Sequence, residues 1–303
     1  MSLVASRPVG TKTTVGAVMR EIRRRLHDAG VDSAEQEAGW LMEHALGLSP
    51  LRQNMDGNRA LSGEEIDALE ALVAKREARV PLQYLLGTQE FCGLEFEVNP
   101  SVLIPRPETE LLVRELLSRI RATERPVLFD ICTGSGCLAV SLAHRVRGGR
   151  VYASDVSPEA LLTAGRNAER HRVASSITWL AGDLLKPFSA LDLTGSVDAI
   201  LSNPPYIAEV DWPALQPEIR LYEPRLALVA GVRGTEYHER LLIDSMPYLK
   251  PGGLLLLEIG KGQSMSVSEK ARAMDGYRSV DVVRDDAGID RVVVVERADK
   301  IDG

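Results

Sequence analysis

The chain of 303 residues has few cysteines and no excess of positive charge. Its three cysteines, Cys92, Cys132 and Cys137, are too few and too scattered for a disulfide framework or a structural zinc site. We therefore expect reduced thiols and no bound metal. The formal net charge of −7 argues against a protein that follows a nucleic-acid backbone over a long stretch, so no stable nucleic-acid binding is expected.

Long apolar runs are missing as well. No stretch approaches the roughly 20 residues needed to span a bilayer, and the N-terminal residues lack the apolar core and cleavage site of a signal peptide. Hydrophobic residues make up 45% of the chain and charged residues 26%, which is ordinary for a globular protein in water. The sequence thus predicts a soluble cytoplasmic protein without membrane contact.

The N-terminal part of the chain has a helical pattern. Residues 1–80 are predicted to form a small helical bundle, because apolar residues recur there at helical spacing. Ser33 with Gln36, and Ser62 with Glu65, have the spacing of capping boxes and predict two helix starts.

The pattern then changes twice. Residues 81–107 alternate apolar and charged positions between glycines and end in a proline-punctuated stretch, which predicts a β-hairpin and a linker. Residues 108–303 alternate strand and helix patterns, which is typical of a mostly parallel, doubly wound α/β sheet. Strands are expected at 127–131, 150–154, 177–181, 197–202 and 253–259, and a terminal antiparallel pair at 279–284 and 291–296.

A glycine-rich turn follows the first of these strands. Within Cys132–Gly136, Gly134 and Gly136 let the backbone come close to a ligand, and the amides of the next helix face the same point. Asp155 ends the second strand, where a carboxylate can accept hydrogen bonds from both hydroxyls of a ribose. The turn by itself is compatible with NAD, FAD or S-adenosylmethionine.

Two further strand ends favour S-adenosylmethionine. Asp183 and Leu184 follow the third strand, where the carboxylate can meet the adenine amino group, and Asn203 follows the fourth, where a methyl acceptor would lie beside the sulfonium. We therefore predict a cofactor site made of Cys132, Thr133, Gly134, Ser135, Gly136, Asp155, Asp183, Leu184 and Asn203.

The tetrapeptide that begins at Asn203 ends a buried strand, because Pro204 and Pro205 cannot continue the ladder. It offers the Asn203 side chain and the Pro204 carbonyl as hydrogen-bond acceptors, and the ring of Tyr206 as a flat face. Such a site suits a planar group that carries an NH2, whether adenine or glutamine. We predict Asn203, Pro204 and Tyr206 as catalytic residues, and Asn203, Pro204, Pro205 and Tyr206 as substrate-binding residues.

Several segments resemble the HemK/PrmC family, the protein-(glutamine-N5) methyltransferases that act on peptide chain release factors. The similar segments extend over almost the whole chain and include the glycine loop, Pro81–Tyr84, Leu103–Glu110, Asn203–Tyr206, Glu223–Leu228 and Leu257–Gly260. The resemblance implies a seven-stranded Rossmann-like methyltransferase domain over 108–303, an N-terminal helical domain over 1–80 that helps hold the protein substrate, and a hairpin linker over 81–107. It also implies S-adenosylmethionine as the cofactor and the glutamine of a Gly-Gly-Gln loop in class-I release factors as the methyl acceptor. We expect a monomer.

One departure keeps an alternative open. Cys132 stands where the family loop usually has a glycine, and this form of the loop resembles PrmB, the relative that methylates a glutamine of a large-subunit ribosomal protein. In contrast, Pro105–Glu110 looks like PrmC. Methylation of a ribosomal protein therefore remains the alternative, and methylation of adenine N6 is less favoured because the chain is acidic.

The side chains outside these motifs are interpreted as structural. His171 and His238 lie in no recognisable motif, so we interpret them as surface or packing residues. Glu258, at the end of the fifth strand, is interpreted as a capping or sheet-edge contact. For the chemistry, we expect Asn203 and the Pro204 carbonyl to accept the two hydrogens of the glutamine amide, and Tyr206 to pack against that amide.

Overall fold

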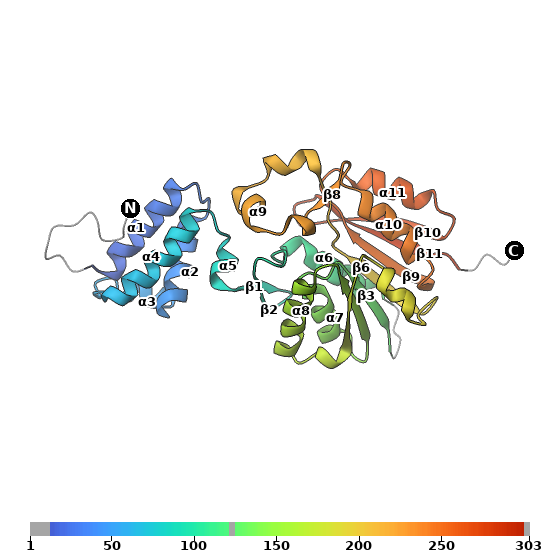
Figure 1. Cartoon of the computed structure of the whole chain (residues 1–303), viewed down its shortest axis with the longest axis horizontal. Helices are drawn as coiled ribbons and strands as arrows, with labels where there is room; N and C mark the ends of the chain where they lie inside the picture. The colour runs from blue at the N-terminus through green and yellow to red at the C-terminus, as the bar shows by residue number, and fades with distance from the viewer. Residues whose placement is uncertain (1–12, 121–124, 300–303) are drawn as a thin grey trace. The chain divides into compact units, whose positions relative to one another are not determined.

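The computed structural model describes residues 13–120 and 125–299 of the chain (Figure 1). These residues divide into two compact units. One unit ends at Gly87 and also includes Gln216–Tyr222, and the other comprises Thr88–Leu215 together with the chain from Glu223 onward. The boundary therefore lies beyond the expected position at 80, and a short segment from the middle of the chain belongs to the first unit.

The first unit is helical. Its helices are α1 Val15–Asp28, α2 Ala34–Leu46, α3 Pro50–Met55, α4 Gly63–Glu77, α5 Leu82–Leu86 and α9 Pro217–Tyr222. Ser62 and Glu65 form the predicted capping box at the start of α4. The helix start predicted at Ser33 is also confirmed, since Ser33 is the N-cap of α2, but no capping box forms there: its hydroxyl caps no backbone amide and donates to the carboxylate of Glu37 at 2.9 Å.

Helix α9 is held by polar contacts within this unit. The carboxylate of Glu218 lies 2.9 Å from Arg76 and 2.6 Å from Arg79, and the hydroxyl of Tyr222 donates to the carbonyl of Ala78 at 2.6 Å. A segment distant in sequence from α4 thus joins the helical unit through charge pairing.

The predicted hairpin forms, but it packs with the second unit. Strands β1 Thr88–Phe91 and β2 Leu94–Glu97 pair antiparallel. Phe91 and Phe96 are fully buried among side chains of α6 Glu110–Arg119 and α7 Cys137–Arg145. Burying these two rings stabilises the hairpin on the second unit, so residues 88–97 belong to that unit.

The second unit contains the seven-stranded sheet that was predicted. Its strands are β3 Val127–Ile131, β4 Arg150–Asp155, β5 Ile177–Ala181, β6 Val197–Ser202, β9 Leu249–Glu258, β10 Tyr277–Arg284 and β11 Asp290–Arg297, and the order across the sheet is β10-β11-β9-β6-β3-β4-β5. The strands from β9 to β5 run parallel, and β10 and β11 form the expected antiparallel pair.

Alternate residues of each strand enter different cores. In β9, Leu254 and Leu256 pack with α6, α7 and α8 Pro158–Arg170, whereas Leu255 and Leu257 pack with α10 Glu236–Ser245 and α11 Ser264–Arg272. These two groups of helices lie on opposite faces of the sheet (Figure 1). A strand buried on both faces must be apolar throughout, which explains the continuous leucine run.

Short elements complete the unit and occupy the loops. They are η1 Pro107–Thr109, η2 Ala174–Ser176, η3 Lys186–Ala190, η4 Glu209–Ala214, η5 Arg225–Ala227 and the parallel pair β7 Ile207–Ala208 with β8 Val229–Gly231. Among the described residues, no helix is long and apolar enough to cross a membrane.

The sheet order creates a switch point. From β3 the chain builds β4 and β5 on one side and later builds β6 and β9 on the other. Loops leave the carboxyl ends of β3 and β6 in opposite directions, which opens a crevice at that edge of an α/β sheet. The predicted site residues follow β3, β4, β5 and β6, so the fold brings them to this edge.

Candidate active site

The loop after β3 has a tightly turned backbone. Cys132, Gly134 and Gly136 all have positive φ angles, of 63°, 56° and 79°. A side chain at Gly136 would bring its Cβ within 2.9 Å of the Ala164 Cβ on helix α8, so that position requires glycine. At Cys132 the same backbone region costs a residue with a side chain roughly 1–2 kcal/mol.

A buried carboxylate shapes this loop from beneath. Oδ2 of Asp130 accepts hydrogen bonds from the Thr133 hydroxyl at 2.5 Å and from the Ala139 amide at 3.0 Å, while its Oδ1 has no partner among the described residues. Burial raises the pKa of Asp130 to about 7. Burial also raises the pKa of the Cys132 thiol, which therefore stays protonated at neutral pH.

A cavity of about 510 Å³ lies in the second unit at the carboxyl edge of the sheet. Its walls include the predicted residues Cys132, Gly134, Asp155, Asp183, Leu184, Asn203 and Pro205. Thr133, Ser135, Gly136, Pro204 and Tyr206 do not line it. Thr133 and Gly136 instead give the loop its shape, through the bond to Asp130 and the close approach to helix α8.

Asp155 and Asp183 are placed on this wall in different ways. Asp155 accepts backbone hydrogen bonds from Gly134 and Ser157, both at 2.9 Å, and burial raises its pKa. Asp183 lies 2.7 Å from Arg240 and 2.7 Å from Lys186, and these cations lower its pKa. Asp183 is thus held ionised and able to accept hydrogen bonds from an amino group.

The amide nitrogen of Asn203 is held by a hydrogen bond to a buried hydroxyl group. Its Nδ2 donates to the hydroxyl of Thr109 at 3.0 Å, and that hydroxyl lies 2.6 Å from the carboxylate of Glu258. The phenol of Tyr206 reaches the other carboxylate oxygen at 3.3 Å. Glu258 is buried, which raises its pKa to about 7, and burial likewise raises the pKa of Tyr206.

Glu223 joins two walls of the cavity. Its carboxylate accepts a hydrogen bond from the amide of Ile104 at 3.1 Å and forms an ion pair with Arg106. The segment that begins at Glu223 is thereby tied to the segment around Ile104. The two segments contribute Leu103, Pro224, Leu226 and Ala227 to the cavity wall.

Several lining residues were not expected from the sequence. Val156 and Leu226 are 53% and 56% exposed and offer apolar surface to a flat ring. Tyr237 and Arg240 come from helix α10. Of these residues, only Val156 could have been found from the sequence, because it directly follows Asp155 at the end of β4. Tyr237 and Arg240 are brought to the cavity by the fold alone.

The histidines are packing residues, as predicted. His238 is fully buried and its Nε2 lies 2.7 Å from the carbonyl oxygen of Glu258, and burial lowers its pKa. His171 packs its ring against Phe96 at 5.2 Å. Glu258, however, is more than the predicted sheet-edge contact, because it bonds Thr109 and Tyr206 beside the cavity.

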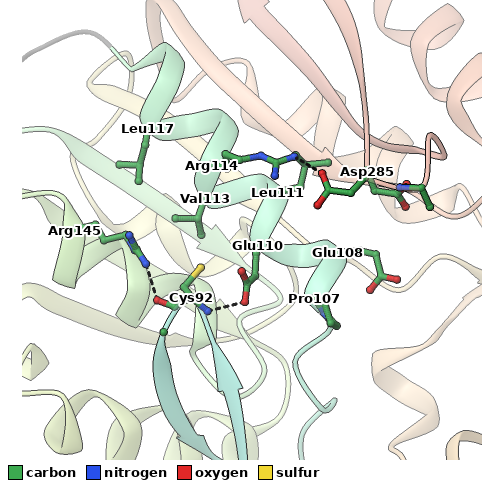
Figure 2. Close-up of a pocket in the computed structure, with 13 residues that line it drawn as sticks. Cys92, Pro107, Glu108, Glu110, Leu111, Val113, Arg114, Leu117, Arg145 and Asp285 are labelled. Atoms are coloured by element: carbon green, nitrogen blue, oxygen red, sulfur yellow. Dashed lines mark hydrogen bonds and ion pairs between the residues drawn. The ribbon is translucent and has the colours of Figure 1, made fainter.

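A second cavity of about 700 Å³ lies in the same unit (Figure 2). It is lined by acidic and basic side chains, including Glu108, Glu110, Arg114, Arg145 and Asp286. None of the predicted site residues lines it, so its larger volume does not make it the candidate site.

The residues of the smaller cavity fit S-adenosylmethionine. Carboxylates are available for the ribose hydroxyls at Asp155 and for the adenine amino group at Asp183, and Val156 supplies an apolar face. The positive-φ loop at Gly134 permits close approach of the cofactor, and the volume is within the usual range of ligand sites. The sheet, its antiparallel last strands and this site define the class of S-adenosylmethionine-dependent methyltransferases.

Comparison with known proteins identifies the family. Residues 17–87 match the PrmC N-terminal domain and residues 107–215 match the Methyltransferase small domain. The release factor glutamine methyltransferase of Geobacter sulfurreducens is 43% identical over 92% of this chain and 95% of its own length. That of Moorella thermoacetica is 40% identical over 95% of this chain and its whole length. The chain therefore belongs to the release factor glutamine methyltransferase family of protein-glutamine methyltransferases, and S-adenosylmethionine is its cofactor.

Solved structures confirm the fold. The structure of a methyltransferase from Pyrococcus furiosus has a TM-score of 0.52 and 22% identity, and the alignment covers 75% of this chain and all of that one. The hMettl16 catalytic domain in complex with MAT2A 3′UTR hairpin 6 has a TM-score of 0.55 and 19% identity, over 76% of this chain and 83% of that one.

Proposed function

We propose that this protein transfers the methyl group of S-adenosylmethionine to the side-chain amide nitrogen of the glutamine in the Gly-Gly-Gln motif of class-I release factors. It would do so as a monomer in the cytoplasm, where peptide chains are terminated. The observation that carries the proposal is the placement of Asn203, which lines the cofactor cavity while its Nδ2 is held by Thr109. The relatives named above, which are release factor glutamine methyltransferases, support the choice of substrate.

The cofactor is assigned to the described cavity. Asp155 would accept hydrogen bonds from the ribose hydroxyls, and Asp183 would accept one from the adenine amino group. Cys132 and Leu184 have positive φ angles of 63° and 50° and would bring backbone groups close to the cofactor. The adenine ring would pack against Val156, which is 53% exposed in the cavity wall.

An amide nitrogen is a weak nucleophile, because its lone pair is delocalised into the carbonyl group. The oxygen of Asn203 and the carbonyl of Pro204, which lies in the chain between the lining residues Asn203 and Pro205, would accept its two hydrogens, orient the lone pair and stabilise the positive charge that develops on nitrogen. Holding the nitrogen near the methyl carbon supplies the rest of the rate enhancement through proximity.

Bound S-adenosylmethionine supplies a methyl group on a positively charged sulfur. In the transfer, the glutamine nitrogen would form the new bond to the methyl carbon, the sulfur would keep the electron pair of the broken bond, and one amide proton would leave to water. The carboxylates of the site are not needed as a strong base, because the amide becomes acidic only as the methyl group arrives.

Tyr206 receives a different role from the one expected. Its phenol bonds Glu258 and its ring does not line the cavity, so we assign it to supporting the acceptor site instead of packing on the amide. Pro205, which does line the cavity, would take over part of that contact.

The helical unit is proposed to hold the release factor. On α2 and α3 of this unit, Trp40, Leu51 and Met55 are 48%, 68% and 74% exposed. Large apolar side chains with this exposure are suited to contact a protein partner.

The test uses the full chain, S-adenosylmethionine labelled on its methyl group, and three acceptors. The acceptors are a purified class-I release factor, ribosomal subunits and DNA. We expect label on the release factor, located to the glutamine of its Gly-Gly-Gln motif by mass spectrometry, and none on a release factor whose motif glutamine is alanine. Label on the ribosomal subunits or on DNA alone would refute the proposed substrate.

A further inference from the structure

A line of hydrogen bonds leads from a buried acid to the catalytic asparagine. The hydroxyl of Thr109 lies 2.6 Å from Oε2 of Glu258 and 3.0 Å from Nδ2 of Asn203. Thr109 is 2% exposed and Glu258 1% exposed, so water does not compete for these bonds. The three residues come from separate parts of the chain, which makes their meeting a product of the fold.

The single hydroxyl proton of Thr109 determines which group donates and which accepts in each of these hydrogen bonds. A threonine hydroxyl has one proton to donate, and an ionised carboxylate can only accept. Thr109 therefore donates to Glu258 and must accept from Asn203, which turns the NH2 of Asn203 inward and leaves its oxygen for another donor.

We propose that Thr109, backed by ionised Glu258, is a positioning residue that holds the amide of Asn203 with its oxygen toward the methyl acceptor. This inference rests on the proposed function, because an acceptor with an NH2 group needs an oxygen opposite it. With the Asn203 amide turned over, two NH2 groups would face each other and the productive hydrogen bond would be lost.

The backbone around Thr109 is held in place from both sides. The Thr109 amide donates to the carbonyl of Arg106 at 3.1 Å. Glu110 accepts a hydrogen bond from the amide of Cys92 at 2.8 Å, and Figure 2 shows its carboxylate pointing toward the hairpin. Glu108 and Glu110 line the second cavity, whereas the side chain of Thr109 bonds Asn203. Thr109 is therefore anchored well enough to orient another side chain.

The charge on Glu258 is set by the groups around it. Its pKa is raised to about 7, chiefly by burial and to a smaller extent by the charge of Glu108, while the bonds from Thr109 and Tyr206 and the charge of Arg291 act in the opposite direction. His238 approaches only its backbone carbonyl.

Protonation of Glu258 would exchange donor and acceptor in both hydrogen bonds of Thr109. A protonated Glu258 can donate to Thr109, whose hydroxyl is then free to donate to Asn203 and to favour the turned-over amide. Since the carboxylate form is the productive one, kcat should rise with pH through about 7.

The first test compares variants of Thr109 in the full chain. We expect Thr109→Val to lower kcat for release factor methylation about 10- to 100-fold, with an unchanged dissociation constant for S-adenosylmethionine, and Thr109→Ser to recover most of the rate. Thr163→Val is the matched control, because Thr163 is equally buried and accepts a hydrogen bond from Asn99 at 3.0 Å without lining the cavity. A Thr109→Val enzyme with the wild-type rate would overturn the inference.

The second test separates positioning from structure by its pH profile. Between pH 6 and pH 8 the wild-type kcat should rise about tenfold, and Glu258→Gln should remove this rise because its amide does not titrate. If the rise persists in Glu258→Gln, it belongs to another group, such as Asp130, and the role of Glu258 is refuted. Label transfer by the wild type is measured first, and its absence would refute the proposed function together with this inference.

Discussion

The two units of this chain differ in whether they contain buried acids without a cationic partner. In the helical unit, buried Glu37 and Arg76 lie 2.6 Å apart as an ion pair. In the catalytic unit, buried Glu223 pairs with Arg106 in the same way. Asp130 and Glu258 are also buried, but no cation lies within ion-pair distance of either among the described residues, and hydroxyl groups bond them instead.

The difference has a consequence for titration. Burial alone would lower the pKa of Arg76, but its bonds to Glu37 and Glu218 raise it, so this charge is permanent. Burial raises the pKa of both Asp130 and Glu258 to about 7. The buried acid of the helical unit is therefore paired, whereas the catalytic unit contains, besides its paired Glu223, two buried acids that change their charge near neutral pH, as is common in active sites.

The largest expected effect is at Asn203, through which Glu258 would reach the methyl acceptor. Asn203→Ala should lower kcat about 10³-fold, because it removes one of the two proposed acceptors for the amide hydrogens. The dissociation constant for S-adenosylmethionine, measured by calorimetry, should rise only moderately. Retained cofactor binding would show that the variant is folded. Methylation near the wild-type rate would exclude this mechanism.

The ion pair of the helical unit is expected to affect stability and not activity, unlike Asn203. Arg76→Met should lower the free energy of unfolding by about 3 kcal/mol, because Glu37 would remain buried without its partner. Urea denaturation of the full chain measures this loss, and kcat of the folded protein at saturating release factor should stay close to wild type.

A double variant controls for this result. Arg76→Met combined with Glu37→Leu removes both charges and should recover most of the lost stability, since an apolar pair of similar volume avoids the unpaired carboxylate. If Arg76→Met is as stable as the wild type, the ion pair with Glu37 does not stabilise the helical unit, and the contrast with the catalytic unit is refuted.

The fold could be predicted from sequence because its signals are local. The apolar runs of the strands, such as Val197–Ser202, and the capping pair Ser62 and Glu65 are read from neighbouring residues. The placement of Asp155 at the end of β4 and of Asn203 after β6 on one cavity wall could be predicted as well, because parallel strands bring their carboxyl ends to one edge.

The supporting contacts could not be predicted, because they join distant segments. Thr109 and Glu258 are 149 residues apart, and Glu223 is 119 residues from Ile104. No periodicity connects such residues, and only the folded sheet brings them together. The same reason explains why Glu258 was interpreted as a sheet-edge contact.

A smaller effect is expected at the cofactor. Asp155→Ala should raise the dissociation constant for S-adenosylmethionine about 10- to 100-fold, because hydrogen bonds from the ribose hydroxyls to a carboxylate would be lost. The exposed Asp192, which does not line the cavity, gives Asp192→Ala as the control and should leave binding unchanged. Calorimetry that finds equal affinities for both variants would reject the ribose assignment.

The smallest effect concerns an exposed polar contact of the helical unit. Ser62 accepts from the amide of Glu65 at 3.2 Å, and Glu65 accepts from the amide of Ser62 at 2.8 Å. Ser62→Ala should cost about 1 kcal/mol of unfolding free energy, with kcat unchanged, whereas Ser62→Asp keeps a capping oxygen and should cost little. If Ser62→Ala lost as much unfolding free energy as Arg76→Met, an exposed helix cap would stabilise this unit as strongly as its buried ion pair does. The contrast between the units would then not depend on burial.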